Sequence, residues 1–262
     1  MKDVPSMQVS HPGGFAPNPV LSRGEGRPIV FLHGLFGQEW NGFLDDLATT
    51  RKVYAPAHAG SVDPSDLETL DGLWDLLIYY DDLFAALGLS RFDLVGHSFG
   101  GMMAAEFAAM YPDRIGKLVL IDSLGLWNDS YPVADHLLST PPVQTAMRFH
   151  DLGNAAVAEQ IKAPTEPAEI QAALVTRFLA LSSTSQFIHP IPDRGLRRRL
   201  RRIKAETLII WGAEDQLIPR PYADEFAAGI ENSRTEIVAN AGHTPHVEQR
   251  GLVADQVRAF LG

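Results

Sequence analysis

Short apolar runs alternate along this chain with segments of helical periodicity. The runs lie at 29–32, 92–95, 117–121 and 207–211, with weaker ones at 53–55 and 236–238. A strand that is buried on both faces shows such a run, and helices between these strands imply a parallel sheet covered by right-handed crossovers. The sequence therefore predicts an α/β fold with a mostly parallel sheet.

Residues 64–88 carry an apolar stripe at three- and four-residue steps and predict a helix. Ser65 and Glu68 have the spacing of a capping box at its start, and Gly88 supplies a stop. Gly72 lies inside this segment and disfavours helix, so the helix could also begin after it. Further helices are expected at 102–110 and 247–261.

Two parts of the chain depart from this alternation. Residues 1–28 are rich in proline and glycine, so any strands there are expected to be short edge strands. Residues 123–203 contain scattered prolines, no convincing strand and amphipathic pieces such as 170–181. We expect a core domain of residues 1–122 and 204–262 with a helical cap inserted over 123–203.

Composition excludes several classes of site and partner. The chain has 262 residues and no cysteine, which rules out disulfides, thiolate metal sites and a cysteine nucleophile. It carries 32 acidic and 22 basic residues, and the net charge of −10 disfavours nucleic acid and membrane surfaces as partners. No segment has the pattern of a secretory signal or a transmembrane helix. We expect a cytoplasmic protein, either a monomer or a homodimer.

Gly96-His97-Ser98-Phe99-Gly100 lies between an expected strand and an Ala-rich helix. In a turn this sharp the central residue adopts strained backbone angles, and the positions two before and two after it must be small. Such a turn holds Ser98 at a helix N-terminus, where backbone N–H groups and the helix dipole stabilise negative charge. The pattern predicts that Ser98 is a nucleophile.

A serine hydroxyl needs a base within hydrogen-bond reach. Among nine histidines, His243 follows the last expected strand and is the best candidate, with His246 as the fallback. His33 and His97 lie inside glycine motifs, where a structural role is usual. A metal site formed by His243 and His246 is disfavoured, because no third ligand suggests itself.

The base needs an acid that fixes its tautomer. Asp215 follows the strand at 207–211 and is preferred, while Asp122 at the end of an earlier strand remains an alternative. Either choice gives the chain order serine, acid, histidine, which is the order of hydrolases built on this kind of sheet.

Acyl transfer also needs two hydrogen-bond donors for the oxyanion of its tetrahedral intermediate. One is the backbone N–H of Phe99. The other is expected from the loop His33–Gly37, with Leu35 as the first choice and Phe36 as the alternative.

These motifs together resemble the alpha/beta-hydrolase fold family over essentially the full length of the chain. The resemblance rests on His33-Gly34, on residues 96–100 and 208–215, and on Gly242-His243. It implies a twisted sheet of about eight strands, a helical cap and a triad of Ser98, Asp215 and His243. Within the family, the chain is similar to esterases, lactonases and hydrolases of carbon–carbon bonds. One departure is Ala57-His58-Ala59-Gly60-Ser61, where the family usually has D-x-P-G-x-G-x-S.

We therefore expect a serine hydrolase that cleaves a small to medium carboxylic ester or related acyl compound through an acyl-enzyme, with no cofactor and no metal. Alternatives are hydrolysis of a carbon–carbon bond in a diketone and a receptor that binds a small ligand without fast turnover. Phe36, Trp127 and Phe187 are expected to line the substrate pocket. Arg148 and Arg177 could bind a substrate carboxylate.

Overall fold

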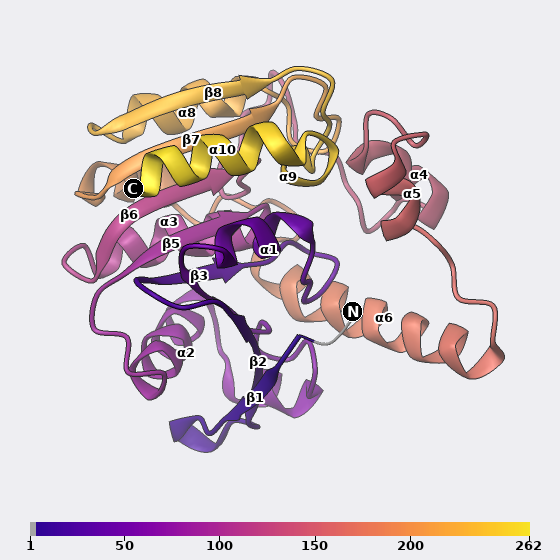
Figure 1. Ribbon diagram of the computed structural model, residues 1–262, viewed down its shortest axis with the longest axis horizontal. Helices are drawn as coiled ribbons and strands as arrows, with labels where there is room; N and C mark the ends of the chain where they lie inside the picture. Colours follow the sequence, from indigo (N-terminus) through magenta and orange to yellow (C-terminus); the bar gives the residue numbers. More distant parts are fainter. Residues whose placement is uncertain (1–3) are drawn as a thin grey trace.

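Eight strands form one sheet in the computed structural model, which describes residues 4–262 (Figure 1). The strand order is β1-β2-β4-β3-β5-β6-β7-β8, in which β1 and β2 run antiparallel to their neighbours and all other pairs are parallel. The strands are β1 (Ser6–Val9), β2 (Asn18–Arg23), β3 (Pro28–Leu32), β4 (Lys52–Ala55), β5 (Phe92–His97), β6 (Ile115–Ile121), β7 (Glu206–Gly212) and β8 (Ser233–Val238). The expected mostly parallel sheet of about eight strands is confirmed. Of the two strands in the proline-rich segment, β1 is an edge strand as expected, whereas β2 pairs with both β1 and β4 and is not.

Helices cover both faces of the sheet, so that alternate residues of the central strands enter two separate cores (Figure 1). One face packs against α1 (Gly42–Ala48) and α10 (Arg250–Leu261), and the four-residue α9 (Pro245–Glu248) precedes α10. The other face packs against α2 (Leu73–Ala86), α3 (Phe99–Met110) and α8 (Pro221–Gly229). The carboxyl ends of β3, β5, β7 and β8 consequently meet at one edge.

The helix expected over 64–88 is divided. Residues Pro64–Thr69 form the 3-10 helix η2, and α2 begins after Gly72, as the glycine suggested. The capping box of Ser65 and Glu68 is wrong, because the cap is Asp63, whose carboxylate accepts the backbone N–H of Ser65. Since η2 and α2 do not share one helical register, Trp74 does not continue the apolar stripe and is 52% exposed.

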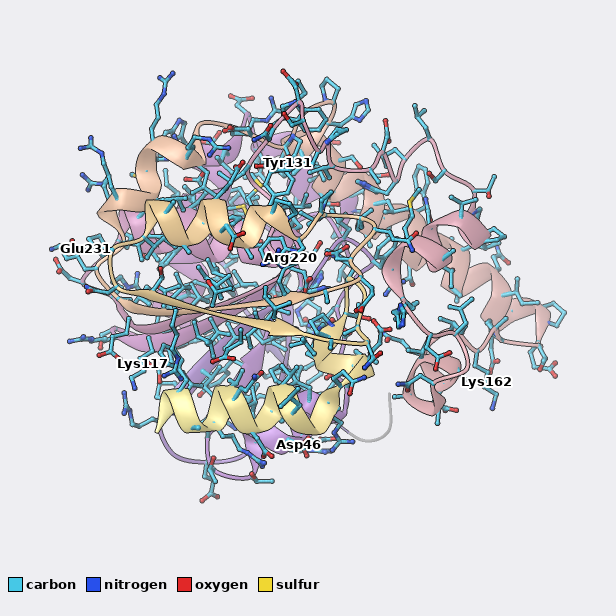
Figure 2. All side chains as sticks on the ribbon, turned by 90° about the horizontal axis from the view of Figure 1, so that it is seen from above. Asp46, Lys117, Tyr131, Lys162, Arg220 and Glu231 are labelled. Carbon is cyan, nitrogen blue, oxygen red and sulfur yellow. The ribbon has the colours of Figure 1, made fainter. Side chains whose placement is uncertain are left out.

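Residues 123–203 contain helices and no strand. These helices are α4 (Pro141–Arg148), α5 (Ala155–Gln160), α6 (Pro167–Ile188), α7 (Leu196–Arg199) and the 3-10 helix η3 (Leu200–Arg202). In Figures 1 and 2, α4, α5 and much of α6 extend beyond the carboxyl-terminal edge of the sheet. The division into core and cap stays a prediction. Across residues 4–262, no helix is long and apolar enough to cross a membrane.

The arginine-rich segment at the end of the expected cap forms a buried ion pair with the core. Arg199 donates two hydrogen bonds, of 2.6 and 2.5 Å, to the carboxylate of Glu106 on α3, a residue that is fully buried. Leu196, Leu200 and Ile203 of the same segment are buried, as their spacing predicts.

Replacing Glu106 with alanine is expected to lower the free energy of unfolding by about 3 kcal/mol, because it leaves Arg199 partly buried without its partner. Urea denaturation measures this change. Asp113→Ala is the matched control, since Asp113 pairs with Lys204 at 3.3 Å but has an 89% exposed side chain. An equal effect of the two substitutions would contradict the importance of the Glu106 ion pair.

Candidate active site

Ser98 lies at a sharp turn between β5 and α3, with the strained backbone angles φ 56° and ψ −119°. A Cβ atom on Gly96 would lie 2.3 Å from the carbonyl oxygen of Gly100, and one on Gly100 would lie 2.1 Å from that of Leu32. Only glycine fits at these two positions. The turn therefore has the geometry that the sequence predicts.

His243 lies on the loop after β8 and donates a 2.8 Å hydrogen bond from Nδ1 to Oδ2 of Asp215. The second oxygen of Asp215 accepts the backbone N–H groups of Leu217 and Ile218, at 2.8 and 3.0 Å. Both side chains are buried. The carboxylate thus fixes the tautomer in which Nε2 of His243 is free to accept a proton.

Ser98 Oγ and His243 Nε2 are both buried, and within residues 4–262 neither has a hydrogen-bond partner. The two residues are linked through His97, whose Nε2–H donates a 2.7 Å hydrogen bond to the backbone carbonyl of His243. Hydrogen bonds of a catalytic pair are often long in a ligand-free enzyme and tighten in the complex. Both atoms are thus free of other hydrogen bonds among the described residues, as a nucleophile and its base would need to be.

His246, the fallback base, faces elsewhere. Its ring lies 4.6 Å from that of His97 and packs against Phe31 and Phe43. The nearest carboxylate to form an ion pair with it is Glu39, at 3.8 Å. The geometry favours His243 over His246 as the base.

The loop after β3 runs directly beside Ser98. A Cβ atom on Gly34 would lie 3.2 Å from Cβ of Ser98, and the next residue, Leu35, is buried. Phe99 is the first residue of α3, where backbone N–H groups have no partner within the helix. The two expected oxyanion donors, Leu35 and Phe99, thus lie on the two segments that flank Ser98.

Asp122, the alternative acid, is buried next to Asp215 and does not hold His243. Its Oδ1 accepts the N–H of Gly212 at 2.9 Å, and its Oδ2 has no partner in the described part of the chain. Burial and then the neighbouring charge of Asp215 raise the pKa of Asp122 well above its usual range. Asp122 therefore holds its proton more tightly than an ordinary aspartic acid does.

Two further residues of the site are not evident from the sequence. Glu248 accepts the N–H of Gly242 at 2.8 Å and that of His150 at 2.7 Å, which fixes the loop carrying His243 against the segment after α4. His136 is buried, and burial lowers its pKa to about 4. Its Nε2 has no hydrogen-bond partner among residues 4–262. Their only signal in the sequence is the residue type, because the contacts of Glu248 and the burial of His136 depend on the tertiary structure.

The expected pocket residues occupy three places. Trp127 and His136 line a cavity of about 120 Å³. Phe187 is buried with its ring 6.3 Å from that of Phe99. Phe36 lies under two cations, with the guanidinium carbons of Arg148 and Arg177 at 4.0 and 5.3 Å from its ring centre.

In the loop 57–61, which lacks the D-x-P-G-x-G-x-S pattern, His58 is buried against His33 of the loop after β3. His58 donates from Nε2 to the carbonyl of His33 at 2.8 Å and accepts the hydroxyl of Tyr80 at 2.6 Å. His33 donates from Nδ1 to the carbonyl of Gly34, and burial lowers its pKa to about 4. Both rings are neutral supports of the loop that carries Leu35.

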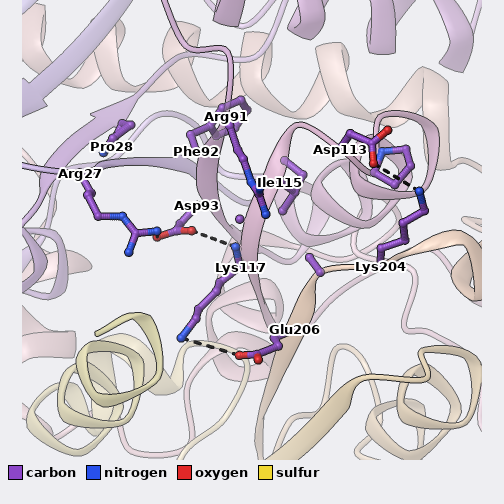
Figure 3. A pocket seen from close by; sticks show the side chains of 13 residues that line it. Arg27, Pro28, Arg91, Phe92, Asp93, Asp113, Ile115, Lys117, Lys204 and Glu206 are labelled. Atoms are coloured by element: carbon purple, nitrogen blue, oxygen red, sulfur yellow. Dashed lines mark hydrogen bonds and ion pairs between the residues drawn. The ribbon is translucent and has the colours of Figure 1, made fainter.

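A second pocket, of about 630 Å³, lies at the opposite edge of the sheet, at the starts of β3, β5, β6 and β7 (Figure 3). Its charged side chains form pairs, such as Lys204 with Asp113 at 3.3 Å and Lys117 with Glu206 at 3.7 Å. It is far from Ser98, and it contains none of the expected site residues.

Comparisons with known proteins identify the family of the chain. Residues 29–256 match the model of a family described as the alpha/beta hydrolase family. The chain is 28% identical to a 2-hydroxy-6-oxo-2,4-heptadienoate hydrolase of Pseudomonas putida, over 88% of this chain and 87% of that protein. It is also 28% identical to a 2-hydroxymuconate semialdehyde hydrolase of Pseudomonas putida, over 91% and 88%.

Solved structures show the same fold. A meta-cleavage product hydrolase from Pseudomonas fluorescens aligns with a TM-score of 0.75 and 19% identity, over 98% of this chain and 97% of that one. Naproxen esterase from Bacillus subtilis aligns with a TM-score of 0.73 and 19% identity, over 99% and 92%.

Relative to wild type, the Asp122→Asn variant is expected to become increasingly stable as the pH rises above about 4, the unfolded pKa of an aspartic acid. The folded pKa of Asp122 lies above the unfolded value of about 3.9, so the folded state keeps a proton that the unfolded state loses, and stability falls with rising pH. Asparagine is nearly isosteric with the neutral acid and has no such proton. Urea denaturation across this pH range measures the difference, with Asp113→Asn as the exposed control. A gain that is the same at every pH would contradict a raised pKa of Asp122.

Proposed function

We propose, on the premise that the chain belongs to the alpha/beta hydrolase family, that it is a serine hydrolase acting through Ser98, His243 and Asp215. The observation that carries the proposal is the buried hydrogen bond between Asp215 and His243, on a loop tied to the strained turn at Ser98. The substrate is a small to medium carboxylic ester or related acyl compound.

In this mechanism His243 takes the proton of Ser98 as the hydroxyl oxygen attacks the substrate carbonyl. The N–H groups of Leu35 and Phe99 stabilise the oxyanion, and Asp215 stabilises the imidazolium. His243 then protonates the leaving group. In the second half, His243 takes a proton from water as the water attacks the acyl-enzyme, and it returns that proton to Ser98 as the acid product leaves. The chemistry uses only side chains and backbone groups of this chain.

The arginine pair over Phe36 favours a substrate that carries an anionic group. Burial and the charge of Arg177 oppose the charge of Arg148 and lower its pKa to about 10, while Glu39 partly offsets them. Nε of Arg148 has no hydrogen-bond partner in the described chain. A carboxylate bound between the two guanidinium groups would supply that partner and relieve their repulsion.

A second candidate reaction is hydrolysis of a carbon–carbon bond beside a ketone. It is supported by the two Pseudomonas relatives, whose names specify a hydroxy-oxo-dienoate and a muconate semialdehyde, and by the arginine pair. The same Ser98 and His243 would serve, with a carbon leaving group in place of an alcohol.

Ser98→Ala is expected to abolish the burst of product from an activated ester while the fold persists, because no acyl-enzyme can form. Stopped-flow absorbance with a nitrophenyl ester measures the burst, and circular dichroism checks the fold. An undiminished burst would overturn the assignment of Ser98.

Asp215→Asn is expected to lower kcat by up to ~10⁴, as when a triad acid is neutralised. Asp122→Asn is the matched substitution and should leave most of the activity, because the carboxylate that His243 contacts is Asp215, while Asp122 accepts the N–H of Gly212. If the Asp122 variant loses activity and the Asp215 variant keeps it, the acid is wrongly assigned.

Arg177→Met is expected to lower kcat/KM for a carboxylate-bearing diketone by about tenfold or more, since a charge-assisted hydrogen bond contributes about 1.5–3 kcal/mol. A neutral nitrophenyl ester should be unaffected. Arg198→Met, at an exposed position of α7, is the control. Equal losses on both substrates would argue against a carboxylate site.

If the wild-type protein turns over neither the diketone nor the nitrophenyl ester, that result would favour the alternative in which the protein is a receptor for a small ligand.

A further inference from the structure

Glu39, His97 and His246 form a cluster behind the turn at Ser98, with one ligand atom from each residue within 4.8 Å of the others. Both histidines are buried. We propose that these three side chains bind a divalent transition-metal ion of the zinc class, and that this ion inhibits the adjacent hydrolase site.

His97 already has the arrangement of a metal-ligating histidine. Its Nε2–H donates to the backbone carbonyl of His243 at 2.7 Å, which leaves Nδ1 with a lone pair. That Nδ1 is buried and has no partner within residues 4–262. Histidines that bind metals commonly donate their other ring N–H to a carbonyl or carboxylate in this way.

His246 carries two buried ring nitrogens, neither with a hydrogen-bond partner in the described chain. Its ring is enclosed by the aromatic rings of Phe31, Phe43 and His97. An unsatisfied buried polar group costs about 1–3 kcal/mol. A bound ion would satisfy nitrogens that the protein itself leaves unpaired.

Glu39 supplies the anionic ligand and the route from solvent. Its Oε2 accepts hydrogen bonds from Asn41 at 3.2 Å and from Gln160 at 3.4 Å. Its Oε1 lies 3.8 Å from Nε2 of His246, too far for a hydrogen bond. Because the Glu39 side chain is 20% exposed, an ion can reach the cluster from this side.

The donor set selects the metal. Two imidazole nitrogens and one carboxylate oxygen suit zinc and its neighbours, whereas magnesium and calcium require oxygen ligands. Ligand atoms on one tetrahedral zinc ion lie roughly 3.4 Å apart, so a movement of about 1 Å closes the present cluster around the ion. Water fills the fourth position.

The Arg148 cation opposes this ion, because it lies near enough to interact with both Glu39 and His97. Removing this charge should therefore tighten metal binding.

Inhibition follows because the metal ligand His97 is connected to both reactive residues. It directly precedes Ser98 in the chain, and its ring donates a hydrogen bond to the backbone carbonyl of His243. A metal that pulls the His97 ring displaces both groups from their reactive positions.

The experiment titrates the full chain with Zn²⁺ by calorimetry and with Co²⁺ by visible absorption, neither of which requires activity. Wild type should bind one ion per chain. Glu39→Gln and His246→Phe should each weaken binding at least tenfold, and Arg148→Gln should strengthen it. His246→Phe conserves an aromatic ring among aromatic neighbours, and Glu39→Gln is at a partly exposed position, so both should fold.

Two controls identify the site. His189→Gln removes an exposed histidine and should change nothing. Asp122, Asp215 and His243 form the other group with metal-ligand spacing, and His243→Ala should retain Zn²⁺ binding if the proposed cluster is the site. Loss of binding in His243→Ala but not in His246→Phe would overturn the proposal, and so would absence of binding by the wild type. Zn²⁺ inhibition of ester hydrolysis that Glu39→Gln relieves would support the link to activity.

Discussion

The structure depends on one close approach of backbones at the carboxyl ends of β3 and β5. The carbonyl of Leu32 lies where a side chain on Gly100 would be, and the carbonyl of Gly100 lies where one on Gly96 would be. This contact holds Ser98 at φ 56°, a conformation that a serine adopts only when its surroundings impose it. Two well-packed cores on the two sheet faces supply that constraint, so the reactive position is fixed by the packing of the whole sheet.

The central strands could be predicted because strands covered on both faces carry continuous apolar runs. β8 could be predicted only in its last residues, since it is an edge strand and most of its side chains are partly exposed. The sequence periodicity of residues 64–88 did not show that two separate helices, η2 and α2, replace the single expected helix. Asp63 caps the first turn, and Gly72 then separates η2 from α2. Trp74, which fits the apolar stripe in sequence, is left in solvent.

At the candidate site, residue types and positions after strands were sufficient to select Ser98 and His243 as candidates, but not to separate Asp215 from Asp122. Both aspartates follow neighbouring strands, and what distinguishes them is tertiary. Asp215 receives two N–H groups of its own loop in addition to His243, whereas Asp122 receives one N–H and faces another carboxyl group. Glu248 could not be predicted for the same reason, because its partner His150 comes from a distant part of the chain. The burial of His136 is likewise tertiary.

The net charge of the chain also gives a poor guide to its site. An acidic protein places two arginines over Phe36, one residue from the expected oxyanion donor. The cation of Arg148 favours an anion bound near Phe36 and Arg177. The same cation opposes a metal ion at Glu39, His97 and His246. A bound carboxylate neutralises Arg148 and thereby lowers the electrostatic cost of the metal. Since coupling between two binding sites is reciprocal, the metal should in turn favour retention of an anionic substrate or product while it disturbs the residues that turn it over.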